Sequence, residues 1–154
     1  MSTEIERKFL VVDDAWRAAA APVRYCQGYL DSAKLATVRV RVAGNAGYLT
    51  VKGPTIGVSR SEYEYEIPVD DARAMLEALC RKPIIDKRRS SVEFAGMTWE
   101  VDEYHGANDG LIVAEVELER EDQSLELPPW VGEEITGDCR YRNSNLAAHP
   151  YREW

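Results

Sequence analysis

Cysteine and histidine are scarce in this sequence, and their scarcity excludes several kinds of site. The 154 residues include three cysteines and two histidines. Cys26, Cys80 and Cys139 are widely spaced and form no CxxC pair, which indicates reduced thiols in a cytoplasmic protein. We predict that they are small core residues rather than metal ligands. His105 and His149 lie far apart and no HExxH motif occurs, so both are predicted to be structural.

Long apolar runs and an excess of basic charge are also missing. No stretch approaches the ~20 apolar residues of a membrane helix, and the charged residues near the N-terminus argue against a signal peptide. The 19 basic and 27 acidic residues give a formal charge of −8, which argues against broad nucleic-acid binding. We therefore expect a cytoplasmic protein with no nucleic-acid or membrane partner, folded as one domain over residues 1–154.

Alternation of side-chain character with a period of two runs through most of the chain. Strands are predicted at residues 4–12, 25–31, 36–43, 47–53, 59–68, 84–94, 97–104 and 111–120. Turn-forming residues separate the strands, and no linker or repeat interrupts them. Eight closely spaced strands favour a mainly β (α+β) fold, a closed eight-stranded antiparallel β-barrel with a few peripheral helices.

Three helical segments are expected between or after these strands. One short, alanine-rich piece begins at 13–16, and another is predicted near 140–147. The longest spans 72–80 and has Leu79 on its apolar face. Asp70-Asp71 is expected to cap this helix and to place negative charge at the positive end of its dipole.

The polar positions of the strands are almost all charged, and the strands are sorted by the sign of that charge. Val38-Arg39-Val40-Arg41-Val42 alternates valine with arginine, whereas Ala114-Glu115-Val116-Glu117-Leu118-Glu119 alternates apolar residues with glutamate. For any single strand, one core face and one solvated face is the simpler explanation. Across six strands, the near absence of uncharged polar residues instead favours a barrel with a charged, occupied lumen. The pattern alone leaves both interpretations open.

A charged lumen needs ligands, because buried charge at this density is unstable without partners. An oligophosphate with a divalent metal would satisfy both signs, since arginine and lysine bind phosphate oxygens and carboxylates bind Mg²⁺ or Mn²⁺. The cations of this face are Lys8, Arg39, Arg41, Lys52, Arg60, Lys87 and Arg89. A Walker-type GxxxxGK[ST] motif is absent, and Gly53-Pro54-Thr55-Ile56-Gly57 is predicted to be a plain loop.

These residues carry a family resemblance. Glu4-Ile5-Glu6-Arg7-Lys8 resembles the ExExK motif of the CYTH superfamily, also called the triphosphate tunnel metalloenzymes. Counterparts continue along the chain at Gln27-Gly28-Tyr29-Leu30, Leu49-Thr50-Val51-Lys52-Gly53 and Trp99-Glu100-Val101-Asp102, and the tail 137–147 is similar to the small bacterial single-domain branch. The resemblance implies an eight-stranded antiparallel tunnel that hydrolyses a triphosphate with Mg²⁺ or Mn²⁺.

The resemblance also implies roles for individual residues. The metal ligands would be Glu4, Glu6, Glu115 and Glu117, and the phosphates would be bound by Lys8, Arg39, Arg41, Lys52, Arg60, Lys87 and Arg89. Glu62, Glu64, Glu100 and Asp102 would orient the cations, hold metal-bound water or simply balance charge. The base for the attacking water would be Lys52, or Lys8 paired with Tyr29, unless that tyrosine only donates a hydrogen bond.

Inorganic triphosphate (tripolyphosphate) is the expected substrate, with pyrophosphate and phosphate as products, because a chain this small leaves little room for a nucleoside pocket. A thiamine triphosphatase or a nucleoside triphosphatase is the alternative. A class IV adenylyl cyclase is disfavoured, since only Met1-Ser2-Thr3 precedes Glu4 and the expected His-Phe pair is missing. A non-catalytic polyphosphate-binding module is disfavoured because a pure anion binder gains nothing from carboxylates beside its phosphates. Dimers are common among similar proteins, which leaves a homodimer open.

Overall fold

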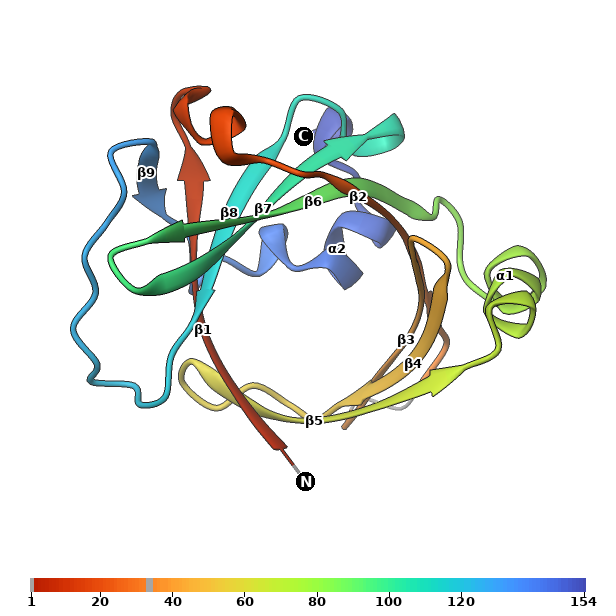
Figure 1. Ribbon diagram of the computed structural model, residues 1–154. Helices are drawn as coiled ribbons and strands as arrows, with labels where there is room; N and C mark the ends of the chain where they lie inside the picture. The colour runs from red at the N-terminus through yellow and green to blue at the C-terminus, as the bar shows by residue number, and fades with distance from the viewer. Residues whose placement is uncertain (1, 33–34) are drawn as a thin grey trace.

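The strands close into a barrel (Figure 1), as the alternation predicts. The computed structural model describes residues 2–32 and 35–154. Its strands are β1 (Ser2–Val11), β2 (Val23–Leu30), β3 (Thr37–Ala43), β4 (Ala46–Lys52), β5 (Ser59–Ile67), β6 (Ile85–Phe94), β7 (Met97–His105), β8 (Ile112–Glu117) and β9 (Val131–Glu134). They pair in the order β5-β4-β3-β2-β6-β7-β8-β1-β9, and an additional pairing of β5 with β1 closes the first eight into a ring. The predicted eight-stranded antiparallel barrel is confirmed.

The first strand, β1, closes the ring because three strands pair with it. On one edge β8 pairs along the middle of β1, with Glu6 opposite Glu117. The other edge is shared, since β5 pairs with residues 2–5 and β9 pairs from Phe9 onward. Between those two pairings, the backbone N–H of Lys8 donates to Oγ1 of Thr136 at 3.0 Å. The short strand β9 was not predicted, because its sequence, Val-Gly-Glu-Glu, has no alternation.

The helical segments lie around the barrel wall and at its end. They are the helices α1 (Val69–Ala78) and α2 (Asn143–Ala148) and the 3-10 turns η1 (Ala15–Ala19), η2 (Gly106–Asn108), η3 (Cys139–Tyr141) and η4 (Tyr151–Glu153). The expectation of a cap at Asp70-Asp71 is wrong. Pro68 occupies the N-cap position without a side-chain hydrogen bond, and both aspartates lie in the first turn. Leu79 was also placed wrongly, because α1 ends before it and its side chain is 61% exposed.

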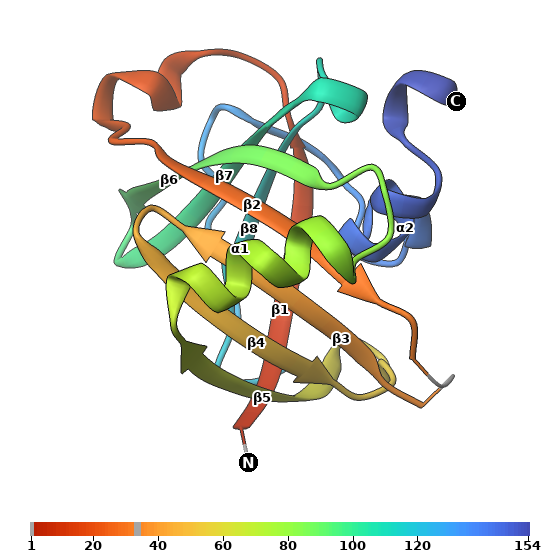
Figure 2. The same cartoon turned by 90° about the vertical axis from the view of Figure 1, so that its right-hand side faces the viewer.

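The apolar faces of the strands point outward, and other segments cover them. Helix α1 lies across the outer face of β3 and β4 (Figure 2), where Leu76 packs on Val40 and Val42. The approach is close at Gly47, since a Cβ atom there would stand 2.9 Å from the Cβ of Ala72. This arrangement directs the alternate, charged side chains of β3 and β4 into the barrel.

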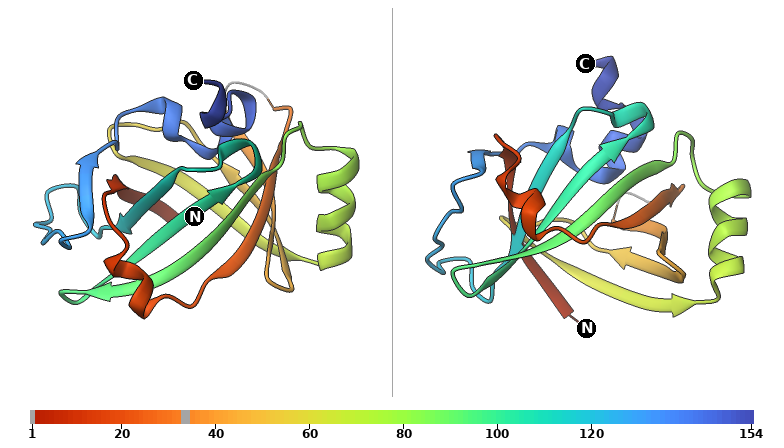
Figure 3. Two further views of the ribbon diagram at one scale, coloured as in Figure 1. Left: turned by 90° about the horizontal axis from the view of Figure 1, so that it is seen from above. Right: turned by 45° about the horizontal axis from the view of Figure 1, so that its top comes forward.

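Of the two remaining apolar clusters, one covers the outer wall and the other closes one end of the lumen. One gathers Phe9, Trp16, Trp99 and Trp130 outside β1, β7 and β8. The other holds Leu146 of α2 in a cluster on β6, β7 and β8, so that α2 lies within the outline of the ring in Figure 1. Figure 3 shows α1 and β9 on opposite sides of the barrel.

The cysteines only partly follow the prediction of core positions. Cys80 is buried and Cys26 is half-buried, but Cys139 is exposed, so the prediction is wrong for that thiol. In the two stretches 2–32 and 35–154, no helix combines the length and the apolar character needed to cross a membrane.

Candidate active site

The inward-facing side chains line a cavity of about 320 Å³ inside the barrel. The predicted residues in its lining are Glu4, Glu6, Lys8, Tyr29, Arg39, Arg41, Lys52, Arg60, Glu62, Glu64, Arg89, Glu100, Glu115 and Glu117. These side chains come from the eight strands β1 to β8, and the period-two pattern turns all of them to one side of the sheet. The charged face therefore lines the lumen, as the occupied-lumen interpretation predicted.

Lys87 and Asp102 are the predicted site residues that lie behind this lining. Both side chains are buried, and the Lys87 ammonium donates to Asp102 at 2.8 Å. Burial lowers the pKa of Lys87 to about 7, although the Asp102 carboxylate opposes that change. Burial alone would raise the pKa of Asp102, but Arg89 and Lys87 outweigh it and hold that pKa below its usual value. The position of Lys87 thus makes it a partner of Asp102 in the wall.

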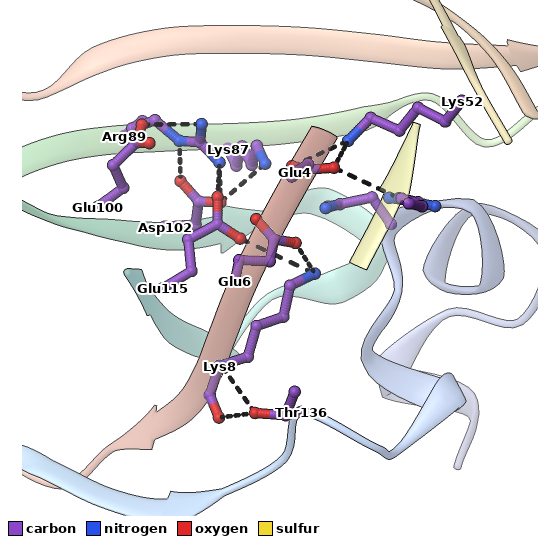
Figure 4. Close-up of polar contacts among 12 residues, drawn as sticks. Glu4, Glu6, Lys8, Lys52, Lys87, Arg89, Glu100, Asp102, Glu115 and Thr136 are labelled. Carbon is purple, nitrogen blue, oxygen red and sulfur yellow. Dashed lines mark hydrogen bonds and ion pairs between the residues drawn. The ribbon is translucent and has the colours of Figure 1, made fainter. Parts of the chain in front are cut away.

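Arg89 connects this buried pair to the cavity (Figure 4). Its guanidinium donates two hydrogen bonds to Asp102, at 2.7 and 2.8 Å, and another to Glu115 at 2.9 Å. It also forms an ion pair with Glu100 at 2.9 Å. An arginine held by three carboxylates has little orientational freedom, so it fixes Glu115 on the neighbouring strand.

The ExExK motif points its charged side chains into the cavity from β1. Lys52 and Arg60 donate to the Glu4 carboxylate at 3.1 and 3.4 Å. Lys8 lies between two acids, 3.7 Å from Glu6 and 3.8 Å from Glu115. The two glutamates of the motif therefore have cationic neighbours from β1, β4 and β5.

The cations near Glu6 nevertheless do not offset the effects of burial and of the neighbouring carboxylates on its pKa. Burial is the largest cause of an increase in the pKa of Glu6 to about 8, and the negative charges of Glu115 and Glu4 add to it. Burial would also raise the pKa of Glu4, but Lys52 and further neighbours lower it well below its usual value. The pKa of Glu117 is raised as well, by burial and then by the negative charge of Glu4. This end of the cavity carries an excess of carboxylate.

The donor chemistry at this end suits a hard divalent cation, which prefers carboxylate oxygens. The pKa of Glu6 is raised by burial and by the Glu115 carboxylate, so a divalent cation bound beside Glu6 would relieve repulsion. As placed, however, no group of three acidic, histidine or cysteine side chains in residues 2–32 and 35–154 is arranged to hold a metal ion. Glu4 and Glu115 instead contact cations, so ion binding would require carboxylates to turn from those partners.

The arginines of β3 supply the opposite character, positive charge, and one of their buried donors has no acceptor in the described residues. The Nε of Arg39 is buried with no hydrogen-bond partner in the described part of the chain, while its Nη2 lies 3.5 Å from Glu64. Arg41 lies over the ring of Tyr25 at 4.9 Å. Burial, followed by the charges of Arg39 and Arg89, lowers the pKa of Arg41 to about 10. Buried donors without acceptors are costly, so this wall of the cavity is suited to an anionic ligand.

Gln27 links two predicted site residues and was not itself assigned a role from the sequence. Its buried amide accepts a hydrogen bond from the Nε of Arg41 at 2.9 Å and donates one to the Tyr29 hydroxyl at 3.2 Å. Because a guanidinium can only donate, the amide oxygen must face Arg41 and the amide nitrogen must face Tyr29. The available signal was parity, since Gln27 lies on the same inward face of β2 as Tyr25 and Tyr29.

We expect Gln27→Leu to lower kcat/KM for tripolyphosphate, the substrate expected from the sequence, by about 100-fold. Arg41 and Tyr29 would lose their shared hydrogen-bond partner, and small misplacements of site residues cost about that much. Gln27→Glu is the matched comparison, since it keeps the acceptor for Arg41 and loses the donor to Tyr29. Steady-state kinetics on the two variants and thermal unfolding would separate positioning from stability. A fully active, folded Gln27→Leu variant would contradict this role.

The C-terminal segment also contributes to the cavity, which the strand pattern could not indicate. Arg142, Asn143 and Ser144 line it at the start of α2. The hydroxyl of Tyr104 donates to Oδ1 of Asn143 at 2.6 Å and ties this segment to β7. The lumen is therefore bounded by eight strands and by the chain segment that covers one end.

The barrel is closed and antiparallel, and its charged lumen gathers carboxylates on one side and arginines on another, one of them with a buried donor that has no partner in the described residues. The chain belongs to the CYTH domain family, whose profile matches residues 2–151. It is 53% identical over 154 residues to an inorganic triphosphatase of Acetivibrio thermocellus, covering 100% of this chain and 99% of that protein. It is 39% identical over 152 residues to an inorganic triphosphatase of Nitrosomonas europaea, covering 94% and 97% of the two chains. The crystal structure of the inorganic triphosphatase NE1496 superposes with a TM-score of 0.68 at 35% identity, covering 93% of this chain and 96% of that one.

Proposed function

We propose that this protein hydrolyses inorganic triphosphate to pyrophosphate and phosphate inside the barrel. The observation that carries the proposal is the lumen itself, a cavity of about 320 Å³ with Arg39 and Arg41 directing donors into it opposite a cluster of glutamates. The names of the two similar proteins support the same activity. Arginine side chains of this kind would bind phosphate oxygens and stabilise the charge that develops as the phosphoanhydride bond breaks.

An inorganic substrate fits this cavity better than a nucleotide. The volume of the cavity, about 320 Å³, lies at the lower end of the roughly 300–1,000 Å³ range of ligand pockets. A nucleobase would need an open aromatic face, but the ring of Tyr25 already has Arg41 at 4.9 Å and Arg89 at 5.1 Å. The lining is otherwise almost entirely charged or polar, so nothing in it favours a base or a thiamine ring.

The carboxylates Glu4, Glu6, Glu115 and Glu117 would hold Mg²⁺ or Mn²⁺, which when bound would polarise phosphate oxygens and lower the pKa of water. The remaining roles belong to this chain's own side chains. Arg39, Arg41, Lys52 and Arg60 would bind the phosphates, and Arg89 would keep Glu115 in place. Glu62, Glu64 and Glu100 would orient these cations.

The proton of the attacking water needs an acceptor, for which two arrangements are available. Lys52 lines the cavity beside Glu4, and its pKa is lowered by burial and by Arg39. Lys8 and Tyr29 also line it, and there Glu115 and Glu6 outweigh burial and raise the pKa of Lys8. We keep both as candidates, to be separated by the pH dependence of kcat in Lys52→Met and Tyr29→Phe variants.

A phosphate-release panel tests the substrate. We expect tripolyphosphate to be turned over with a kcat/KM at least about tenfold above ATP, thiamine triphosphate or pyrophosphate, because contacts to a nucleoside or thiamine are lacking. Each substrate would be assayed with Mg²⁺, with Mn²⁺ and with EDTA. Faster hydrolysis of ATP or thiamine triphosphate would contradict the substrate assignment, and turnover in EDTA would contradict the metal requirement. Tight binding of tripolyphosphate without any phosphate release would instead indicate a non-catalytic polyphosphate-binding module.

A cytoplasmic location and a homodimer remain predictions. The location rests on the spacing of the cysteines and the acidic composition. The oligomeric state would be measured by light scattering at several protein concentrations, where a mass near twice 17.4 kDa would indicate the dimer.

A further inference from the structure

Arg142 lies where the main cavity meets a smaller side chamber. It lines the cavity inside the barrel and also a second space of about 40 Å³. That chamber is bounded by Lys8, Arg60 and Thr136, at the place where the edge of β1 passes from β5 to β9. Arg142 thus reaches the ExExK residues from outside the strands.

The backbone of Arg142 is held in place by the docked C-terminal segment. Its N–H donates to the carbonyl of Cys139 at 3.2 Å, and its own carbonyl accepts from the N–H of Leu146 at 2.8 Å. Leu146 and Ala147 are buried in the apolar cluster on β6, β7 and β8. These contacts fix the start of α2 and direct the Arg142 side chain to the lumen.

The guanidinium of Arg142 has no polar or aromatic partner in the part of the chain that the structure describes. Within residues 2–32 and 35–154 it makes no hydrogen bond, ion pair or aromatic contact. Other lumen cations differ, since Lys8, Lys52, Arg60 and Arg89 each have a carboxylate within 4 Å. Arg140, two residues earlier, also differs, because it pairs with Asp138 and lies over the ring of Trp154.

An unpaired, half-buried guanidinium on the wall of an anion site has one evident use. Its planar donors match a phosphate group in two parallel hydrogen bonds, and this gain is not reduced by breaking an existing ion pair. We propose that Arg142 is a substrate-binding residue that contacts a phosphate of tripolyphosphate where the cavity meets the side chamber. This inference rests on the proposed function. It adds to the strand cations a contact that exists only while the C-terminal segment is docked.

The test is steady-state kinetics on the full-length protein with tripolyphosphate and Mg²⁺. Arg142→Gln is expected to raise KM about tenfold, the effect of losing one charge-assisted hydrogen bond, and to change kcat much less. Arg142→Lys keeps the charge without the planar fork, so its KM should lie between those of Arg142→Gln and the unmodified protein. Arg140→Gln removes the same charge from the same segment, but the Arg140 side chain lies over Trp154 and does not line the cavity. The KM of this variant should be unchanged. Thermal unfolding of Arg142→Gln should closely match the unmodified protein, because no hydrogen bond, ion pair or aromatic contact of Arg142 within the described residues is lost.

The outcomes separate this inference from the proposed function. If the unmodified protein hydrolyses tripolyphosphate and Arg142→Gln leaves KM unchanged, the role of Arg142 is wrong and the function stands. If Arg140→Gln raises KM as much as Arg142→Gln, the effect is one of general charge, and the inference is again overturned. If the unmodified protein releases no phosphate from tripolyphosphate, both proposals fail.

Discussion

Glu6→Gln is expected to reduce kcat with tripolyphosphate and Mg²⁺ by at least about 100-fold. Loss of groups that merely support metal ligands costs about 10–100-fold, and Glu6 is proposed as a ligand itself. The amide keeps the size of the side chain and removes the charge at a position crowded by Glu115 and Glu4. Initial rates over a range of Mg²⁺ concentrations would measure the effect, and a fully active variant would exclude Glu6 from the metal site.

The same substitution is expected to stabilise the fold at neutral and alkaline pH. The pKa of Glu6 is raised from 4.5 to about 8 by burial and by Glu115. Between those pH values the folded state keeps the proton while the unfolded state loses it, so this group's contribution to stability declines as pH rises. In Glu6→Gln the amide does not titrate, so this decline in stability with rising pH is absent. Its free energy of unfolding should therefore exceed that of the unmodified protein by a margin that grows from pH 4.5 to 8, reaching about 2–5 kcal/mol.

Urea unfolding at pH 5 and pH 8 in EDTA would measure this margin. Glu66→Gln on β5 is a suitable control, because Glu66 is exposed and its substitution should give the same small difference at both pH values. Adding Mg²⁺ at pH 8 should stabilise the unmodified protein more than Glu6→Gln, since a ligand stabilises the state that binds it. Parallel pH curves for the unmodified protein and Glu6→Gln would contradict the account of Glu6.

Asp102→Ala is expected to destabilise the protein by about 3–5 kcal/mol, because it leaves buried cations without their counter-charge. Asp102 is 2% exposed and accepts hydrogen bonds from Lys87 and Arg89. Glu100→Ala is the matched control two residues earlier on β7. The Glu100 side chain is 39% exposed and pairs only with Arg89 among the described residues, so its loss should cost about 1 kcal/mol or less.

Urea unfolding of both variants would measure these costs. If Asp102→Ala fails to fold, the isosteric Asp102→Asn, which keeps an acceptor for one of the two cations, provides the measurement and should still cost more than Glu100→Ala. Equal costs for the substitutions at residues 100 and 102 would show that Asp102 has no special structural role. Because Arg89 also holds Glu115, Asp102→Asn should lower activity as well.

The sequence was informative wherever strand geometry decides the outcome. A period of two sets which face a side chain occupies, so the inward positions of Glu6, Arg41 and Lys52 could be predicted. Parity does not give depth along a strand, however. Lys87 and Arg89 share a face of β6, yet Arg89 lines the cavity while Lys87 is covered by Asp102 and by the ring of Tyr104, 5.6 Å from its ammonium.

Features that depend on pairing between distant segments escaped prediction. Strand β9 has no alternation of its own and exists because the edge of β1 beyond Phe9 is free to pair with it. Arg142 reaches the lumen from a turn before α2, where no strand period applies. The arrangement of the glutamates also depends on which cations they contact, and a list of residues on one face does not contain that information.

In the proposed reaction, a phosphoanhydride bond of tripolyphosphate is cleaved inside this lumen with the help of a divalent metal. The most direct measurement is a time course of the products from tripolyphosphate by phosphorus NMR, with Mg²⁺ and then with excess EDTA. We predict that pyrophosphate and phosphate appear in equal amounts with Mg²⁺ and that neither appears in EDTA. Product formation that continues unchanged in EDTA, or no cleavage with either Mg²⁺ or Mn²⁺, would contradict metal-dependent cleavage of tripolyphosphate by this protein.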